Sequence, residues 1–214
     1  MKFFNGHWEK KKGVSVYSPA QIYEWHKTEH ELTFLAPHRE IANRGMTLDG
    51  VVLTFHISVA REGVFHIVVN HYEGVKKKTP SFVVQENLQP LACEETENGF
   101  VLKSGENELQ ITKKPFGMEF FCAGKRMTKM TGEDFSYIRT GDSGVLLYEE
   151  QAEASYMRGA TGLSVGEMIY GLGEQFGPFV KNGQSIDMWN EDGGTSSELA
   201  YKNVPFYLSN RGYG

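Results

Sequence analysis

Apolar and polar residues alternate along much of this chain, which is the pattern of β-strands with one buried face. The clearest case is 53–59, where Leu, Phe, Ile and Val alternate with polar residues, and 65–69 repeats the pattern after a turn at 61–63. Seven further segments are predicted to form strands: Gln21–Lys27, Glu31–Ala36, Phe100–Ser104, Glu108–Lys113, Gly117–Cys122, Gly144–Tyr148 and Val204–Asn210.

Glycine- and asparagine-rich turns separate these segments, for example at Asn98–Gly99 and Ala123–Lys125. No long stretch has helical periodicity. One short helical turn is predicted near Ser196–Tyr201, because Thr195 or Ser196 can cap it and Glu198 stands at a capping-box offset from Thr195. Many short strands with such turns predict an all-β sandwich or barrel. Since no repeat or linker divides the chain, we expect one domain over residues 1–214.

Composition narrows the class of protein. The chain has 214 residues, 40% of them hydrophobic and 23% charged, which is ordinary for a globular protein with a proper core. A net charge of −5 argues against a nucleic-acid partner. The basic runs Lys10–Lys12 and Lys76–Lys78 are isolated and are interpreted as solvated loops.

Cysteine usage and the amino terminus indicate the compartment. Cys93 and Cys122 form no metal-binding or disulfide pattern, so a reducing environment is expected. Residues 1–7 lack the apolar core of a signal peptide, and no apolar run approaches the ~20 residues that span a bilayer. We therefore predict a cytoplasmic protein with no membrane partner, and the residue patterns imply no metal or other cofactor.

The loop at 189–195 carries the most informative chemistry. Trp, Asn, Glu, Asp, two Gly and Thr follow one another between strand-like segments. Carboxylate and amide groups bind vicinal hydroxyls, an aromatic ring covers the apolar face of a pyranose, and glycine permits close backbone approach. The loop is typical of sugar recognition.

A catalytic pair is not evident. Glycosidic cleavage needs two carboxyl groups about 5–5.5 Å apart for retention, and farther apart for inversion. Glu191 and Asp192 are adjacent, so an extended backbone points them in opposite directions. Composition alone leaves Asp192 open as either a turn-forming acid or a ligand. The Gly-x-Gly at 171–173 is interpreted as a strand ending in a tight, strained turn, where Glu174 can accept backbone N–H groups as an anchor.

Two structural roles are expected elsewhere. His56 and His66 occupy polar positions of adjacent predicted strands and are expected to face one another as a structural pair. Trp8 and Trp25 are interpreted as packing residues.

Residues 210–214 resemble a hairpin turn with no strand after it, so we expect a fragment of a longer polypeptide.

Several motifs together resemble the amino-terminal domain of glycoside hydrolase family 31, and most closely its α-xylosidase branch. They are Tyr170-Gly171-Leu172-Gly173-Glu174, Asn182-Gly183-Gln184, Trp189-Asn190-x-Asp192-Gly193-Gly194-Thr195, Tyr201-Lys202-Asn203-Val204-Pro205-Phe206-Tyr207 and Asn210-Arg211-Gly212-Tyr213-Gly214. The resemblance is weaker but collinear from residue 1 to 160.

The resemblance implies a galactose-mutarotase-like β-sandwich (supersandwich) that precedes a catalytic (β/α)8 barrel. It implies that both catalytic aspartates belong to the barrel, so no residue of this chain is expected to be catalytic. A loop at about 180–200 would border the leaving-group subsite, where Asp192 would hydrogen-bond sugar hydroxyls. The residues implied to support that contact or shape the loop are Trp189, Asn190, Thr195, Gly193, Gly194 and Glu174.

We therefore predict a substrate-contacting domain of a retaining hydrolase that acts on α-xylosides, inactive without its barrel. Its expected partners are an α-xyloside or related oligosaccharide and the enzyme's own barrel, with self-association through exposed apolar surface as a further expectation. Three alternatives stay open. A free-standing carbohydrate-binding module needs an exposed aromatic platform, a mutarotase-like epimerase needs a converging His and carboxylate, and a purely structural domain needs neither.

Overall fold

The computed structural model describes residues 4–5, 9–48, 50–71, 89–141, 154–191 and 200–214. The chain divides into two compact units, Met1–Gly162 (unit 1) and Leu163–Gly214 (unit 2). The expectation of a single domain over 1–214 stays a prediction.

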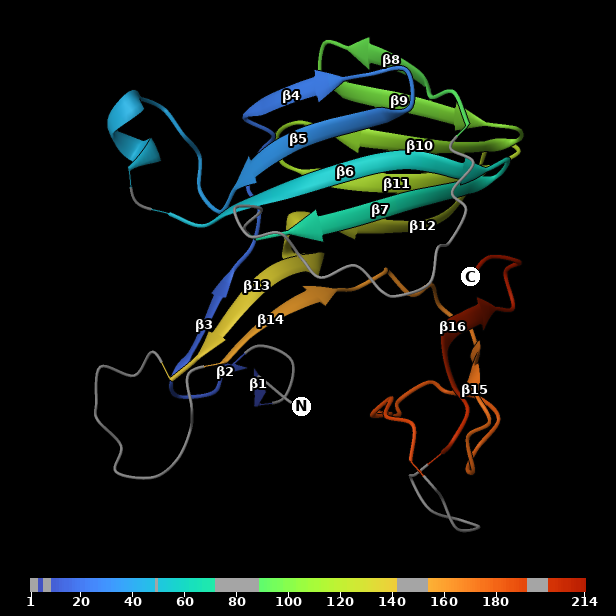
Figure 1. Cartoon of the computed structure of the whole chain (residues 1–214). Helices are drawn as coiled ribbons and strands as arrows, with labels where there is room; N and C mark the ends of the chain where they lie inside the picture. The colour runs from blue at the N-terminus through green and yellow to red at the C-terminus, as the bar shows by residue number, and fades with distance from the viewer. Residues whose placement is uncertain (1–3, 6–8, 49, 72–88, 142–153, 192–199) are drawn as a thin grey trace. The chain divides into compact units, whose positions relative to one another are not determined.

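Unit 1 contains two antiparallel sheets that share one core (Figure 1). The four-stranded sheet has the order β4-β5-β6-β7, and the five-stranded sheet has the order β12-β11-β10-β9-β8. Their bounds are β4 Glu24–Lys27, β5 Glu31–Pro37, β6 Val52–Arg61, β7 Val64–Asn70, β8 Ala92–Thr96, β9 Gly99–Ser104, β10 Asn107–Thr112, β11 Gly117–Cys122 and β12 Lys125–Thr131. The all-β sandwich expected from the alternation is confirmed.

The alternation accounts for the core directly. In β5 and β6, alternate residues are buried, so that Phe34 and Phe55 point inward while Thr33 and His56 point away from the core. The Phe34 and Phe55 rings stack with centroids 4.8 Å apart, and Phe116 packs against both. Full burial of such a side chain contributes about 1.5–3 kcal/mol. The sandwich is therefore held mainly by apolar packing between the sheets.

Smaller elements complete unit 1. A three-stranded sheet has the order β14-β13-β3, and a two-stranded sheet pairs β1 with β2. The bounds are β1 Phe4–Asn5, β2 Glu9–Lys10, β3 Val14–Tyr17, β13 Phe135–Thr140, β14 Ala154–Gly159, and the 3-10 turns η1 Arg44–Thr47 and η2 Gly132–Asp134. Phe135 of β13 packs edge-on against Phe55, which joins the three-stranded sheet to the core.

β4 and β8 are the outermost strands of their sheets at one flank of the sandwich (Figure 1). Side chains connect these two strands. Trp25 lies edge-on to Phe100, and the Lys113 ammonium lies 3.9 Å from the centre of the Trp25 ring. Glu95 accepts hydrogen bonds from the Trp25 indole (3.3 Å) and from Lys113 (2.7 Å). Lys27 of β4 donates to the backbone carbonyl of Cys93 in β8. The expected packing role of Trp25 therefore includes a polar contact, whereas Trp8 lies outside the described residues.

Unit 2 is built on the antiparallel hairpin of β15 (Ile169–Gly173) and β16 (Asn203–Ser209). β15 ends in a β-bulge at Gly171–Gly173 and a tight turn in which the Gln175 N–H donates to the Gly173 carbonyl at 3.0 Å. This strained strand end was expected, and three consecutive residues there have positive φ angles: Gly171 at 106°, Leu172 at 72° and Gly173 at 87°. A Cβ atom at Gly173 would lie 2.3 Å from the Lys202 carbonyl oxygen, so only glycine fits. Leu172 is a strained position, since a branched side chain rarely adopts positive φ.

Some expected boundaries are wrong. The strand expected at Gln21–Lys27 begins at Glu24. Ala200 forms a β-bridge and Tyr201 a bend, so the expected helical turn does not include them, while Ser196 to residue 199 lie outside the described residues. The strand expected at Gly144–Tyr148 also lies outside them.

Candidate functional site

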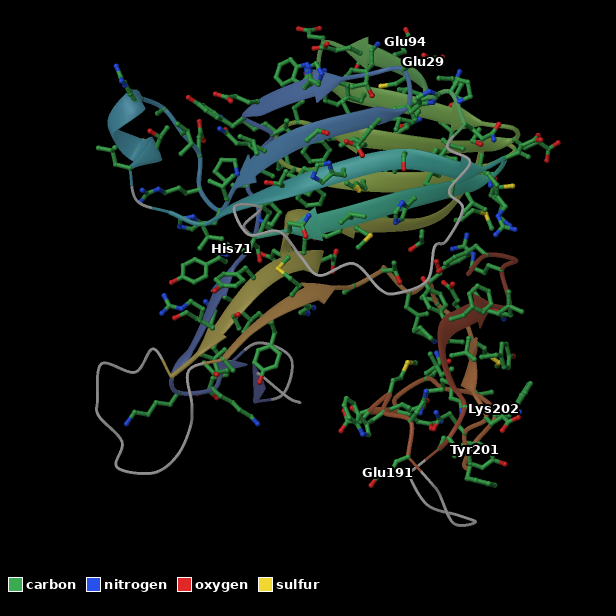
Figure 2. All side chains as sticks on the ribbon, in the orientation of Figure 1. Glu29, His71, Glu94, Glu191, Tyr201 and Lys202 are labelled. Atoms are coloured by element: carbon green, nitrogen blue, oxygen red, sulfur yellow. The ribbon has the colours of Figure 1, made fainter. Side chains whose placement is uncertain are left out.

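Unit 2 contains the described part of the loop that was expected to contact sugar. Trp189 is 74% exposed, and Asn190 and Glu191 are exposed as well. Asp192, Gly193, Gly194 and Thr195 lie outside the described residues. Figure 2 labels Glu191, Tyr201 and Lys202 around the two ends of the segment 192–199. The Glu191 backbone N–H donates to the Ala200 carbonyl at 3.1 Å, which brings those ends together.

Asn203 fixes this junction. Its side-chain amide donates to the carbonyls of Trp189 (2.9 Å) and Ala200 (3.0 Å) and to Oδ1 of Asn190 (3.1 Å). Its backbone N–H donates to the same Asn190 oxygen at 3.0 Å. Asn190 was expected to support or shape the loop, and its Oδ1 atom accepts both of these hydrogen bonds from Asn203. Asn203 belongs to a motif that sequence reasoning noticed without giving that residue a role.

Glu174 lies beside the strained turn. Its backbone N–H donates to the Lys202 carbonyl at 2.9 Å, and its carboxylate lies 3.4 Å from the Lys202 ammonium. Glu174 was expected to accept backbone N–H groups as an anchor, whereas here its backbone N–H donates and its carboxylate forms an exposed ion pair. An ion pair of this kind contributes about 0–1 kcal/mol, so the turn depends mainly on its backbone contacts.

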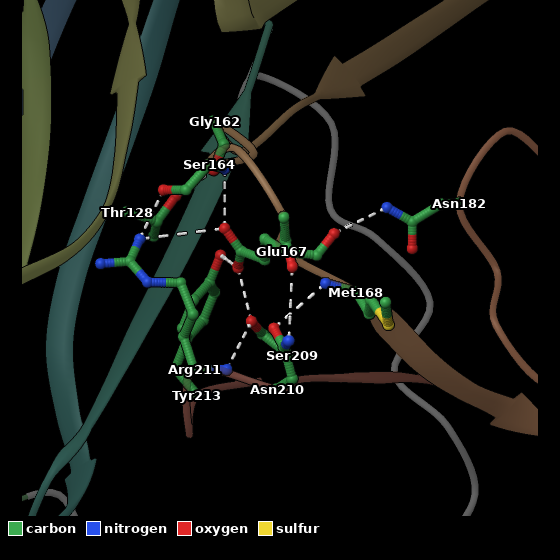
Figure 3. Close-up of polar contacts among 11 residues, drawn as sticks. Thr128, Gly162, Ser164, Glu167, Met168, Asn182, Ser209, Asn210, Arg211 and Tyr213 are labelled. Atoms are coloured by element: carbon green, nitrogen blue, oxygen red, sulfur yellow. Dashed lines mark hydrogen bonds and ion pairs between the residues drawn. The ribbon is translucent and has the colours of Figure 1, made fainter.

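A buried carboxylate, Glu167, organises the rest of unit 2 (Figure 3). It accepts hydrogen bonds from the hydroxyls of Ser209 and Tyr213, each at 2.5 Å, and from the Ser164 backbone N–H at 2.8 Å. The Arg211 guanidinium lies 3.8 Å away. Burial alone raises the pKa of Glu167, but the hydrogen bonds and the Arg211 charge outweigh it and hold that pKa below its ordinary value. Glu167 is therefore a structural, ionised group.

Asn182 and Asn210, which belong to the recognised motifs, form hydrogen bonds with the backbone of residues 167–169. Asn182 donates to the Glu167 carbonyl (2.9 Å) and accepts from the Ile169 N–H (2.9 Å), and Asn210 accepts from the Met168 N–H (3.1 Å). Sequence reasoning missed Glu167 because it stands outside those motifs. What could have pointed to Glu167 is its position in the sequence, just before the motif that begins at Tyr170.

Unit 2 has little apolar core of its own. Among its described residues, only Glu167, Ala200 and Ser209 are buried. On β16, Val204, Phe206 and Leu208 alternate along the strand and are 50%, 53% and 48% exposed. These three side chains form an exposed apolar stripe along β16.

His56 has a different partner from the one expected. Register pairs His66 with Ser58 and His56 with Val68, so the two histidines are diagonal neighbours rather than opposite one another. The Nδ1 atom of His56 instead lies 3.0 Å from the Glu31 carboxylate, which also accepts from the Thr33 hydroxyl at 2.8 Å. The expected His56–His66 pair is therefore wrong, because the strand register offsets the two residues.

The pKa of Glu31 is lowered. Burial raises it, but hydrogen bonds from His56 and Thr33 and the charges of His56 and His66 lower it below the ordinary value of 4.5. A carboxyl group with a depressed pKa stabilises the folded state above its unfolded pKa, and that stabilisation disappears as the pH falls through the folded value.

We expect the Glu31→Gln variant to be less stable than the parent chain at neutral pH. The difference should shrink as the pH falls below about 4.5, because the parent then loses its carboxylate. Urea midpoints at several pH values measure this. Glu29→Gln is the control, since its carboxylate is exposed and 3.8 Å from His30. A Glu31→Gln difference that does not change with pH would contradict the expectation.

The described residues contain no group of three or more His, Cys, Asp or Glu side chains placed to hold a metal ion. No helix in this part of the chain is long and apolar enough to cross a membrane. Cys93 and Cys122 are both free, and burial raises the pKa of the Cys93 thiol.

Comparison with known protein families identifies the family to which this β-sandwich belongs. Residues 54–214 match the glycosyl hydrolase 31 N-terminal galactose mutarotase-like domain, so the chain belongs to that family. Over its whole length it is 35% identical to the α-xylosidase XylQ of Lactiplantibacillus pentosus and 36% identical to an α-xylosidase of Emericella nidulans. The chain spans 27% and 29% of the length of these relatives.

Solved structures agree on the fold. A glycoside hydrolase 31 dextranase of Flavobacterium johnsoniae in complex with isomaltotriose matches with a TM-score of 0.64 and 17% identity, covering 91% of this chain and 22% of that one. A cycloalternan-forming enzyme of Listeria monocytogenes matches with a TM-score of 0.67 and 12% identity, covering 92% and 17%. The galactose-mutarotase-like β-sandwich expected from the sequence is confirmed.

Proposed function

We propose that this chain is the substrate-contacting amino-terminal domain of a retaining, cytoplasmic α-xylosidase. The catalytic carboxylates would lie in a barrel domain outside this chain. The loop at about 180–200 would border the leaving-group subsite, with Asp192 hydrogen-bonding sugar hydroxyls and Trp189, Asn190 and Thr195 supporting it.

The observation that carries this proposal is the similarity over the whole chain to two α-xylosidases, each more than three times its length. The activity of these two relatives supports α-xylosides as the substrate class. The exposed ring of Trp189 supports the role of the loop, because an exposed aromatic ring can cover the apolar face of a pyranose.

The exposed stripe on β16 supports the role as one domain of a larger enzyme. Val204, Phe206 and Leu208 would be covered by the barrel, because unit 2 buries little apolar surface by itself. Without that cover, the same stripe would promote self-association of the chain.

The purified 214-residue chain is expected to release no nitrophenol from p-nitrophenyl α-xyloside. The reason is that the resemblance assigns both catalytic aspartates, the pair that glycosidic cleavage needs, to the barrel. Absorbance of nitrophenol measures release, and the Lactiplantibacillus α-xylosidase serves as the positive control. Robust release by the chain alone would refute the division of labour between the domains.

One observation favours a second function, that of a mutarotase-like epimerase. His56 and Glu31 form a hydrogen-bonded His–carboxylate pair, which is the chemistry needed to move a proton during ring opening. The pair lies on the outer face of the four-stranded sheet, opposite the core side, rather than in a cleft between the sheets. Polarimetry of fresh α-xylose decides between them: faster anomer interconversion that is lost in Glu31→Gln supports the epimerase.

A further inference from the structure

The side-chain amide of Asn203 binds both ends of the segment that holds the proposed sugar-contacting residue. It reaches Trp189 on one side and Ala200 on the other, and its backbone N–H holds Asn190. We infer that Asn203 is the positioning residue of this loop, acting through its N–H donors and touching no sugar itself. The inference rests on the proposed function, since it names what sets the geometry of that site.

The hydrogen bonds determine the orientation of the Asn203 amide. Its nitrogen lies within hydrogen-bond distance of three oxygen acceptors, from Trp189, Asn190 and Ala200, so the nitrogen and not the oxygen of the amide faces them, and its two N–H groups are shared among the three. Its oxygen accepts from the side-chain amide of Gln175. All polar capacity of this side chain is therefore directed at the polypeptide.

Gln175 extends the connection to the strained turn. Its side-chain amide donates to the Leu172 carbonyl at 3.2 Å as well as to Asn203. The Glu174 N–H bonds to the Lys202 carbonyl, one residue before Asn203. Asn203 therefore joins the turn at 172–175 to both ends of the loop, and the glycines at 171 and 173 let the two strands approach closely enough for this.

Asn203 and Asn190 are hydrogen-bonded to each other, one as donor and the other as acceptor, so the same substitution at each position gives an internally controlled test. Asn203→Asp replaces the donor group with a carboxylate oxygen facing three acceptors, whereas Asn190→Asp keeps the acceptor that Asn203 uses. The same chemical change should therefore open the loop ends at residue 203 and leave them closed at residue 190. This separation tests whether the N–H donors of Asn203 hold the loop ends together, and the enzyme kinetics below test whether that matters for substrate.

The first measurement is hydrogen exchange of the Glu191 and Glu174 backbone amides in the 214-residue chain. In Asn203→Asp we expect exchange of Glu191 to be about tenfold faster or more, because a half-buried donor group has been removed. Lowering the pH should reduce the ratio of variant to parent rates, because protonating the carboxyl group introduced at position 203 restores one donor.

Asn190→Asp should leave that ratio near one at every pH. Asn107→Asp supplies a second control, since it removes a similar amide-to-carbonyl bond, to Gly63, within unit 1. Unchanged exchange of Glu191 in Asn203→Asp would overturn the inference, and so would equal acceleration in Asn190→Asp.

The second measurement uses the full-length enzyme and an α-xylosyl disaccharide. Asn203→Asp should raise KM about tenfold while kcat changes less, because the loop binds the substrate but does not react with it. Faster exchange with an unchanged KM would leave Asn203 as the residue that holds the loop ends and reject the sugar contact of the proposed function. Unchanged exchange would reject the positioning role itself, whatever the enzyme hydrolyses.

Discussion

Glu167→Gln is expected to unfold unit 2 locally while unit 1 stays folded. The glutamine cannot carry the charge that Arg211 faces, and its NH2 group would point at donors rather than acceptors. Breaking a buried, hydrogen-bonded charge of this kind costs about 3 kcal/mol. Because unit 2 buries few apolar side chains, it has little other stabilisation to compensate.

Limited proteolysis and amide exchange, followed separately in 1–162 and 163–214, measure this effect. Protection should fall in unit 2 alone. Glu174→Gln is the matched control, because it makes the same substitution at an exposed carboxylate of the same unit. Loss of protection in both units together, or in neither, would contradict the role given to Glu167.

Phe55→Ala is expected to destabilise unit 1 more than any surface substitution. Phe55 is fully buried and its ring contacts Phe34, Phe116 and Phe135. Removing a buried phenylalanine side chain leaves a cavity and costs about 3–5 kcal/mol.

Chemical denaturation followed by circular dichroism gives the loss of unfolding free energy. Leu48→Ala is the control, because Leu48 is 86% exposed and should change stability by at most about 0.5 kcal/mol. If the two variants had similar midpoints, the shared core of the two sheets would be wrong.

The strands with the clearest apolar alternation could be predicted from the sequence, whereas β12, β13 and β14 were not predicted. The residues 53–59 and 65–69 fall inside β6 and β7, and 117–122 coincides with β11. In β12, by contrast, charged residues surround the only two buried positions, Thr128 and Met130. β12 is the end strand of its sheet and buries few side chains, so its sequence shows little of the apolar alternation that identifies a strand.

The residues of the candidate site likewise include some that the sequence could predict and some that it could not. Side-chain chemistry identified the loop and its exposed Trp189. It could not identify Glu167 or Asn203, because their roles depend on partners distant in the sequence. Glu167 accepts hydrogen bonds from Ser209 and Tyr213, 42 and 46 residues away. Asn203 donates to Asn190 and Trp189, 13 and 14 residues away. The motifs at 182 and 210–213 could be recognised in the sequence, but only the contacts show that they stabilise unit 2.

The bridge between β4 and β8 has a consequence for the behaviour of the chain in concentrated solution. Outermost strands offer unpaired backbone groups to which a neighbouring molecule can add its own strand, and this is a route to fibrils. Here Lys27, Glu95 and Lys113 surround that flank, so an incoming strand would have to strip water from several charges. The same side chains that close the sandwich thereby discourage amyloid-like growth from it.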